Sequence, residues 1–379
     1  MIIFISNFIS EHQIPFCEAL YKATNGDFWF IATKPMSEER KKLGFVDQSS
    51  KFPFVLKSYV NNEAVNNARN LAISADIAIL GDAPYVYVDQ RVKNGKITFK
   101  YTERYFKQTR LKVCDPRVLK SVFERDFQYR KLPYYLLCAG AYVAGDAALI
   151  KSYPEKMYKW GYFPKTVVFD NINEVIINKK KNSLLWVGRF IDWKHPEIPV
   201  KVAKELKNRN INFQMTMIGN GPLSYKIEKM VRKYGLSNCV TLTGALSPER
   251  VRDEMEKSEI FIFSSDRNEG WGAVLNESMN AACVPVADNM IGSVPFLIKN
   301  GENGLTYAKA DVGKLTDNID LLFSNQKRRE KMAKEAYNTI ITEWNAEVAA
   351  TRFIELSDAL LHGEKFFFQS GICSKADVI

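Results

Sequence analysis

Two cations five positions apart open the second half of the chain. Arg189 and Lys194 follow the apolar run LLWVG and precede Pro196, where a helix-length amphipathic segment begins. The first turn of a helix has unpaired backbone N–H groups and favours negative charge. Two cations beside such a helix start could bind a diphosphate. The alternative is that both are ordinary loop charges.

Two carboxylates eight positions apart, Glu269 and Glu277, follow the apolar run EIFIFSS. We expect a helix to begin near Trp271, with Glu269 before it and Glu277 about two turns inside it. Glu269 could accept hydrogen bonds from ligand hydroxyls, and the amides of Gly270, Trp271 and Gly272 could meet a phosphate. This pattern suits a polyhydroxylated ligand that carries a diphosphate. The alternative is a charge at a helix start and a solvated glutamate.

A glycine turn lies between these two segments. Gly219, Asn220 and Gly221 follow the apolar run FQMTMI. Glycines allow a tight turn and a close approach of the backbone to a flat or charged ligand. Turns of this kind are also common in proteins that bind nothing there.

These segments must be positioned by the elements around them. Short apolar, β-rich runs alternate with helix-length amphipathic segments along the whole chain, which predicts βαβ units and α/β architecture with mainly parallel sheets. In the first half, the runs IIFIS, DFWFIAT, DIAIL, KITFKY and YYLLCA predict strands. We expect two doubly wound domains at residues 1–170 and 184–345, a linker at 171–183, a C-terminal helix at 346–362 that packs back on the first domain, and a tail at 363–379.

Composition narrows the class of protein. The 379 residues are 46% hydrophobic and 25% charged, and no apolar run approaches the roughly 18 residues that cross a bilayer. Six scattered cysteines argue against a disulfide framework or a zinc site and favour a cytoplasmic protein. With three histidines and no D-x-D motif, we expect no metal and no cofactor.

The net charge of +10 is concentrated between Lys100 and Lys165, which hold 14 Lys or Arg against 6 Asp or Glu. Aromatic residues are interleaved with these cations. Nucleic acid, an anionic membrane surface, a phosphate-bearing acceptor or plain solvation of a basic face would each fit. Since no nucleic-acid-binding motif accompanies the stretch, we expect no nucleic acid partner.

The run from Leu185 to Tyr307 resembles the donor-binding domain of the family 4 retaining glycosyltransferases. Three features carry the resemblance in order: G-R-x4-K at 188–194, G-x-G at 219–221 and E-x7-E at 269–277. The resemblance implies a GT-B fold, in which two Rossmann-like domains face a central cleft. It also implies that Gly188, Arg189 and Lys194 hold the diphosphate of a nucleotide sugar. Glu269 would contact the sugar hydroxyls, the amides after it the phosphate or sugar, and Glu277 the ribose.

The first half more loosely resembles bacterial enzymes that build capsular and exopolysaccharide repeat units. The segments SNFISEHQIPF, KPMSEERKKLGF, TFKYTERYFKQ and KWGYFP carry this resemblance. It implies a glycan or lipid-linked glycan acceptor and a protein at the inner face of the cell membrane. The chain lacks the glycines that many family members have in the first loop and the histidine that they often have in the middle of this domain.

His12 and Glu103 are the available substitutes for the donor contact that family members make from this domain, and both are candidate catalytic residues. Each has a structural alternative, a histidine that caps its loop and a glutamate paired with Arg104 or Lys107. His195 stands where the family often has glycine, and we expect it to shape the loop.

Together these features predict a metal-independent retaining glycosyltransferase. A sugar-nucleotide 2-epimerase of similar fold would need more proton-transferring histidines than this chain offers. A non-catalytic nucleotide-sugar or polyanion binder would leave the set of Arg189, Lys194, Glu269 and Glu277 without a purpose. Both remain alternatives.

Overall fold

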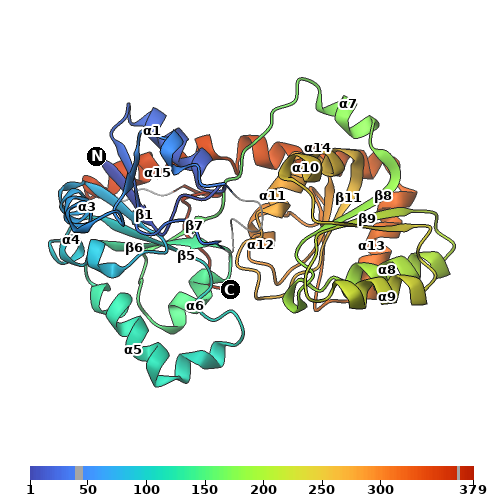
Figure 1. Cartoon of the computed structure of the whole chain (residues 1–379), viewed down its shortest axis with the longest axis horizontal. Coiled ribbons are helices and arrows are strands. Elements are labelled where there is room, and N and C mark those ends of the chain that lie inside the picture. Colours follow the sequence, from blue (N-terminus) through green and yellow to red (C-terminus); the bar gives the residue numbers. More distant parts are fainter. Residues whose placement is uncertain (39–45, 365–367) are drawn as a thin grey trace. The chain divides into compact units, whose positions relative to one another are not determined.

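The computed structural model describes residues 1–38, 46–364 and 368–379. Within these residues the chain forms two compact units (Figure 1). The first contains Met1–Lys165 and Asn345–Ile379, and the second contains Thr166–Trp344. The sequence predicts that the first domain ends at residue 170 and the second at residue 345, whereas the units of the structure change at 165/166 and 344/345. Of the segment KPMSEERKKLGF at 34–45, residues 39–45 lie outside the described residues.

The first unit is built on a seven-stranded parallel sheet in the order β3-β2-β1-β4-β5-β6-β7. Its strands are β1 (Ile2–Ser6), β2 (Phe28–Ala32), β3 (Val55–Lys57), β4 (Ile77–Leu80), β5 (Thr98–Thr102), β6 (Tyr134–Ala139) and β7 (Met157–Trp160). Its helices include α1 (Ile14–Ala23), α3 (Asn62–Ser74), α4 (Asp89–Lys93), α5 (Pro116–Arg125), α6 (Val143–Leu149) and α15 (Ala346–Leu361). Helix α15 packs against this unit through Phe353, whose ring lies 6.2 Å from that of Phe16 on α1 and 5.0 Å from that of Phe99 on β5.

Strands β3 and β7 are not among the strands that the sequence predicts. They are the two edges of the sheet and have three and four residues. A strand at the end of the sheet order has a full strand as neighbour on one side only, so its sequence carries less of the apolar run that marks a central parallel strand. In β3 all three residues are only half-buried.

The second unit has a six-stranded parallel sheet in the order β10-β9-β8-β11-β12-β13. Its strands are β8 (Lys180–Val187), β9 (Gln214–Ile218), β10 (Val240–Gly244), β11 (Ser258–Phe263), β12 (Val284–Asp288) and β13 (Leu305–Tyr307). Its helices are α7 (Ile172–Ile177), α8 (Glu197–Asn208), α9 (Ser224–Lys233), α10 (Pro248–Lys257), α11 (Val274–Asn280), α12 (Val294–Leu297), α13 (Val312–Ser324) and α14 (Gln326–Thr342).

Both sheets change winding direction at one pair of strands. In the first sheet these are β1 and β4, and in the second they are β8 and β11, where Leu184 pairs with Ile260. In doubly wound sheets, ligands bind outside the carboxyl ends of the strands at this point. The segment Gly188–Lys194 follows β8, and the segment that contains Glu269 follows β11.

Two segments differ from their expected character. Residues 171–183, expected as a linker, contain α7, whose first turn is capped by the Asn171 side chain, and the start of β8. Residues 363–379 are expected as an irregular tail, but their described part pairs with β7: the Lys159 amide donates to Ser374 O at 2.8 Å, and the Cys373 amide donates to Lys159 O at 2.9 Å. No helix in the described part of the chain has the length and apolar character needed to span a bilayer.

Candidate functional site

Lys194 and Glu269 lie together at the carboxyl ends of β8 and β11. The Lys194 ammonium forms an ion pair with the Glu269 carboxylate, and the two side chains are 14% and 10% exposed. Glu269 also accepts a hydrogen bond from Ser265 Oγ at 2.9 Å, and Lys194 Nζ lies 4.7 Å from the centroid of the Trp193 ring. The structure therefore joins two residues that are 75 positions apart in sequence.

Hydrogen bonds hold the loops after β8 and β11 to each other. Ser264 Oγ donates to Lys194 O at 2.9 Å and itself accepts from the Trp186 indole N–H at 2.9 Å. The Asp266 amide donates to Trp193 O at 3.0 Å. Ser264 and Trp186 are buried, so these bonds are protected from water. They fix the position of Lys194 relative to the β11 loop.

His195 connects the same two loops. Its backbone has a φ of +49°, in the left-handed region that favours glycine. Its ring nitrogens lie 3.1 Å from Glu197 and 3.3 Å from Asp266. The hydrogen bond to Glu197 is the main cause of a raised pKa of His195, and Asp266 adds to it. A histidine here accepts the backbone conformation of a glycine and gains two carboxylate partners.

Arg189 differs from Lys194 in its surroundings. It is exposed at the carboxyl end of β8, two positions after the strand. Its neighbours Gly188 and Phe190 are held by backbone bonds, from the Gly188 amide to Ile218 O at 3.0 Å and from the Phe190 amide to Asn220 O at 2.8 Å. The loop is therefore fixed while the guanidinium of Arg189 faces solvent.

The glycine turn after β9 packs on the β8 loop. Gly219 has a φ of +132°, and a Cβ atom there would overlap the Gly188 carbonyl oxygen. At Gly221 a Cβ would come within 2.6 Å of Phe190 O. The sequence predicts that another group comes close to the backbone at these glycines, and that this group is a ligand. In the structure the neighbouring loop takes that place, while Asn220 is exposed.

The helix after β11 begins later than expected. Helix α11 starts at Val274, so the expected start near Trp271 is wrong, and Glu277 lies in the first turn instead of two turns inside. Gly272 has a φ of +83°, which no α-helix contains, and a Cβ there would overlap the Phe263 ring. Gly270 and Trp271 are buried. The Trp271 indole donates to Asn276 Oδ1 at 2.9 Å.

In the first unit, His12 and Glu103 meet through a third residue. The His12 ring stacks on Tyr162 with centroids 5.9 Å apart and planes 10° apart. The Tyr162 hydroxyl donates to Glu103 at 2.6 Å, and Lys107 pairs with the other Glu103 oxygen at 2.5 Å. The Lys107 pairing is one of the structural alternatives considered for Glu103. Burial raises the pKa of Tyr162 above its ordinary value.

Tyr162 is the functional candidate that sequence reasoning missed. It follows β7, the edge strand that the sequence does not reveal, so its place at a carboxyl strand end was hidden. The segment KWGYFP contains it and carries part of the family resemblance, which was the available signal.

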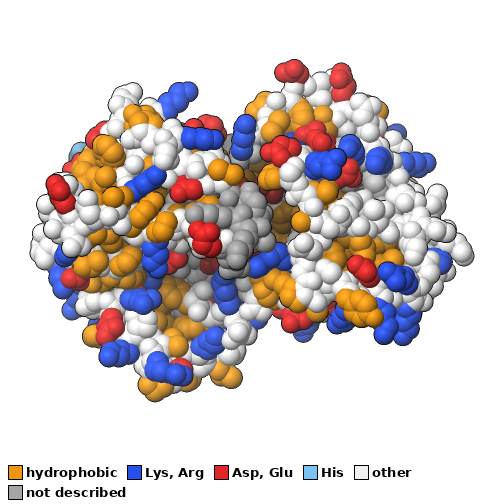
Figure 2. Space-filling model, in the orientation of Figure 1, with side chains coloured by type: hydrophobic (Ala, Val, Ile, Leu, Met, Phe, Trp, Pro, Cys, Tyr) orange, Lys and Arg blue, Asp and Glu red, His pale blue; other side chains and the backbone are white. Residues whose placement is uncertain are grey.

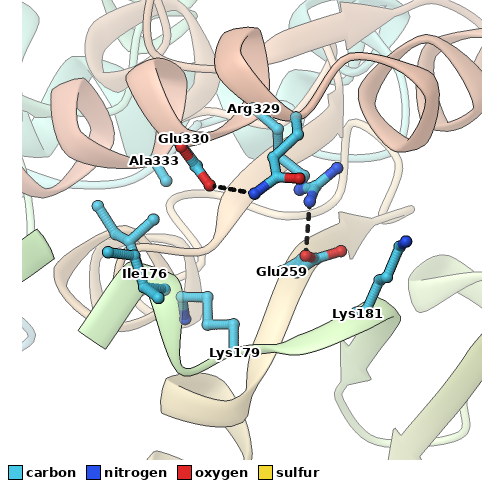
Figure 3. A pocket seen from close by; sticks show the side chains of 9 residues that line it. Ile176, Lys179, Lys181, Glu259, Arg329, Glu330 and Ala333 are labelled. Carbon is cyan, nitrogen blue, oxygen red and sulfur yellow. Dashed lines mark hydrogen bonds and ion pairs between the residues drawn. The ribbon is translucent and has the colours of Figure 1, made fainter. Parts of the chain in front are cut away.

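A pocket of about 200 Å³ lies near the amino ends of β8 and β11, at the end of the second sheet opposite to the candidate site. Figure 3 shows Arg329 directed at Glu259, with which it pairs at 2.7 Å. Lys179 donates to three main-chain carbonyls, among them Ala281 O at 2.8 Å. Burial lowers the pKa of Lys179 and raises that of Glu259. Lys179 stabilises the carboxyl-terminal ends of α10 and α11 by donating to their carbonyls.

Two Rossmann-like parallel sheets, each wound from a central strand, define the GT-B fold. The solved structure of HepE from Anabaena, in complex with UDP, shares this fold with a TM-score of 0.70 and 11% identity over 94% of this chain and 99% of that one. Residues 168–339 match the family model described as glycosyl transferases group 1, so this part of the chain is similar to the domain that the model describes. It contains every candidate donor-binding residue.

Curated relatives match less than half of this chain. The alpha-D-kanosaminyltransferase of Streptomyces kanamyceticus is 31% identical over 153 residues, 40% of this chain and 39% of the relative. An alpha-1,4-N-acetyl-D-galactosaminyltransferase of Campylobacter jejuni, named for a diNAcBac-PP-undecaprenol-linked acceptor, is 26% identical over 176 residues, 46% of each chain. The chain therefore spans less than half the length of these two relatives.

Proposed function

We propose that the protein is a family 4 retaining glycosyltransferase. It moves a sugar from a nucleotide diphosphate sugar to a hydroxyl of a glycan acceptor, most readily a lipid-linked polysaccharide repeat unit. It acts in the cytoplasm, at the inner face of the cell membrane. The observation that carries the proposal is the meeting of Lys194 and Glu269 at the winding switch of a sheet whose domain matches the glycosyl transferases group 1.

The two cations stabilise the leaving group in this account. When the bond between the anomeric carbon and the diphosphate oxygen breaks, negative charge grows on the diphosphate, which Arg189 and Lys194 would meet. The acceptor oxygen bonds to the anomeric carbon from the same face, and its proton passes to the departing phosphate. Fixed cations supply this stabilisation without a metal ion, so we expect turnover to be unchanged by EDTA.

The ion pair between Lys194 and Glu269 prepares the site for the donor. Glu269 holds the ammonium in place, and a bound diphosphate would compete with Glu269 for it. The carboxylate, buried and also bonded to Ser265, would then accept hydrogen bonds from sugar hydroxyls. Glu277, in the first turn of α11, is assigned to the ribose, and the amides of Gly270, Trp271 and Gly272 to the phosphate or sugar.

The first unit supplies the acceptor-side groups in this proposal. His12, Tyr162 and Glu103 form one hydrogen-bonded and stacked cluster. The Glu103 carboxylate and the Tyr162 phenol oxygen, which follow different strands, both keep lone pairs that can accept a hydrogen bond from a glycan hydroxyl. Because the His12 ring stacks on Tyr162, His12→Ala should disturb this cluster. The variant should raise KM for the acceptor more than it changes donor binding.

A transfer assay with a panel of nucleotide sugars and glycan acceptors tests the proposal. The expected product keeps the anomeric configuration of the donor, read from the proton coupling constant of the new linkage by NMR. An inverted linkage would contradict the retaining mechanism. A donor inverted at C2 would identify a 2-epimerase, and binding without turnover would identify a non-catalytic binder.

A further inference from the structure

The apolar face of helix α5 is wider than the part of it that packs against the protein core. Val118 and Val122 point inward, where they pack with Phe106 and Ile150. Leu119 and Phe123 occupy the adjoining strip of the same helix, four positions apart, and are 47% and 55% exposed. The apolar stripe therefore continues past the part that the fold covers.

Two more apolar side chains flank α5 in the sequence, one before the helix and one after it. Leu111, in the 3-10 turn Arg110–Cys114 just before α5, is 77% exposed. On the other side the Phe123 ring lies 5.8 Å from that of Phe127. Figure 1 shows α5 at the margin of its unit, away from the sheet.

Cations surround this strip. Residues 107–131 contain eight Lys or Arg against three Asp or Glu. Asp126 is buried and pairs with Lys100 at 2.6 Å, so it offers no charge to the surface. Figure 2 shows hydrophobic atoms beside Lys and Arg atoms over α5. The exposed cations include Lys112, Arg117, Lys120 and Arg125.

We propose that this α5 surface, formed by residues 110–125, docks the protein on an anionic lipid membrane. Leu111, Leu119 and Phe123 would enter the boundary between headgroups and acyl chains, and the flanking cations would contact lipid phosphates. An exposed apolar strip with basic flanks has both the apolar area and the charge that such a surface requires. This assigns residues to the membrane contact proposed above and does not depend on glycosyl transfer.

Hydrogen bonds attach both ends of α5 to the rest of its unit. The residue after the helix, Asp126, accepts hydrogen bonds from Lys100 on β5, from Tyr105 at 3.3 Å and from Tyr153. The Asp115 side chain caps the first turn through the Arg117 amide at 2.9 Å. Both ends of α5 are thus fixed, so the strip is presented in one orientation.

Vesicle sedimentation of the full chain without donor tests this inference. We expect binding to phosphatidylcholine vesicles that contain phosphatidylglycerol, weakening as salt rises, and little binding to phosphatidylcholine alone. Phe123→Ser and Leu119→Ser should each weaken binding about tenfold, because each removes one large apolar side chain. Tyr225→Ser is the matched control, since Tyr225 is 77% exposed on α9, another basic ten-residue helix. This control should bind like the wild type.

A second readout reports the depth of insertion. Cys114 is exposed within the α5 surface, so a polarity-sensitive dye on this thiol should shift to the blue when anionic vesicles are added, with Cys114→Ser as the blank. Equal binding to both vesicle types, or a Phe123→Ser variant that binds like the wild type, would overturn the proposal. Self-association lost in Phe123→Ser, without vesicle binding, would assign the surface to a second copy instead.

Discussion

Lys194 and Arg189 differ in burial and in what they contribute to stability, although both are assigned to diphosphate binding. Lys194 is largely buried and paired, whereas Arg189 is exposed. Removing Lys194 leaves the Glu269 carboxylate buried without its cation, which destabilises the protein. Removing Arg189 leaves no buried group unpaired.

We therefore predict that Lys194→Ala and Arg189→Ala each lower turnover by about 10²–10³-fold, the cost of losing one charge-stabilising donor. Only Lys194→Ala should also lower Tm, which a thermal melt without ligand measures. Lys201→Ala, an exposed cation on α8, is the control for charge loss. Full turnover in both active-site variants would refute their assignment.

The protonation of His195 makes the stability of the folded protein depend on pH, in a direction that follows from its raised pKa. Its pKa is raised in the folded protein by Glu197 and Asp266. Its stabilising contribution is therefore fully present below the unfolded value of about 6.5 and is lost as pH rises through the folded pKa. His195→Asn, which tolerates the same left-handed backbone, should lower Tm most near pH 5. The deficit should shrink at high pH, and a deficit independent of pH would show that the two ion pairs contribute nothing.

At the scale of elements, the turn after β9 depends on a glycine for two separate reasons. Gly219 has a positive φ and also touches the Gly188 carbonyl, whereas Gly244 has a φ of +72° and open space within 4 Å of where a Cβ would lie. Gly244→Ala should cost about 1 kcal/mol, the penalty of a left-handed backbone alone. Gly219→Ala should cost clearly more in urea unfolding, because two loops must separate. Equal losses of unfolding free energy in the two variants would mean that the β8 loop moves aside at no cost.

The elements that the sequence predicts are those with strong periodic signals. Central strands such as β1 and β11 are fully buried and read as apolar runs. Edge strands β3 and β7 do not, and α11 starts three residues later than expected because Gly272 holds a conformation outside the helical region. A local pattern shows that a helix follows, but the positive φ of Gly272 keeps this residue out of the helix, which begins at Val274.

At the scale of the whole molecule, the two parallel sheets could be anticipated, while the grouping of side chains could not. The alternation of strands and helices predicts two parallel sheets, and the fold confirms them. His12, Glu103 and Tyr162 come from loops after three different strands, and only the three-dimensional sheet order brings them together. The ion pair of Lys194 with Glu269 is equally a product of strand adjacency.

The central claim is that Arg189 and Lys194 bind a nucleoside diphosphate. Its most direct test is a thermal-shift screen of the wild type, Arg189→Ala, Lys194→Ala and Lys201→Ala against UDP, GDP, dTDP, CMP and their sugar conjugates, with NAD as the control. Ligand that binds the native state raises Tm by mass action. We predict a rise with one nucleoside diphosphate class, absent with NAD, kept in Lys201→Ala and lost in the other two variants. No rise with any nucleotide, or the same rise in Lys194→Ala, would contradict the account.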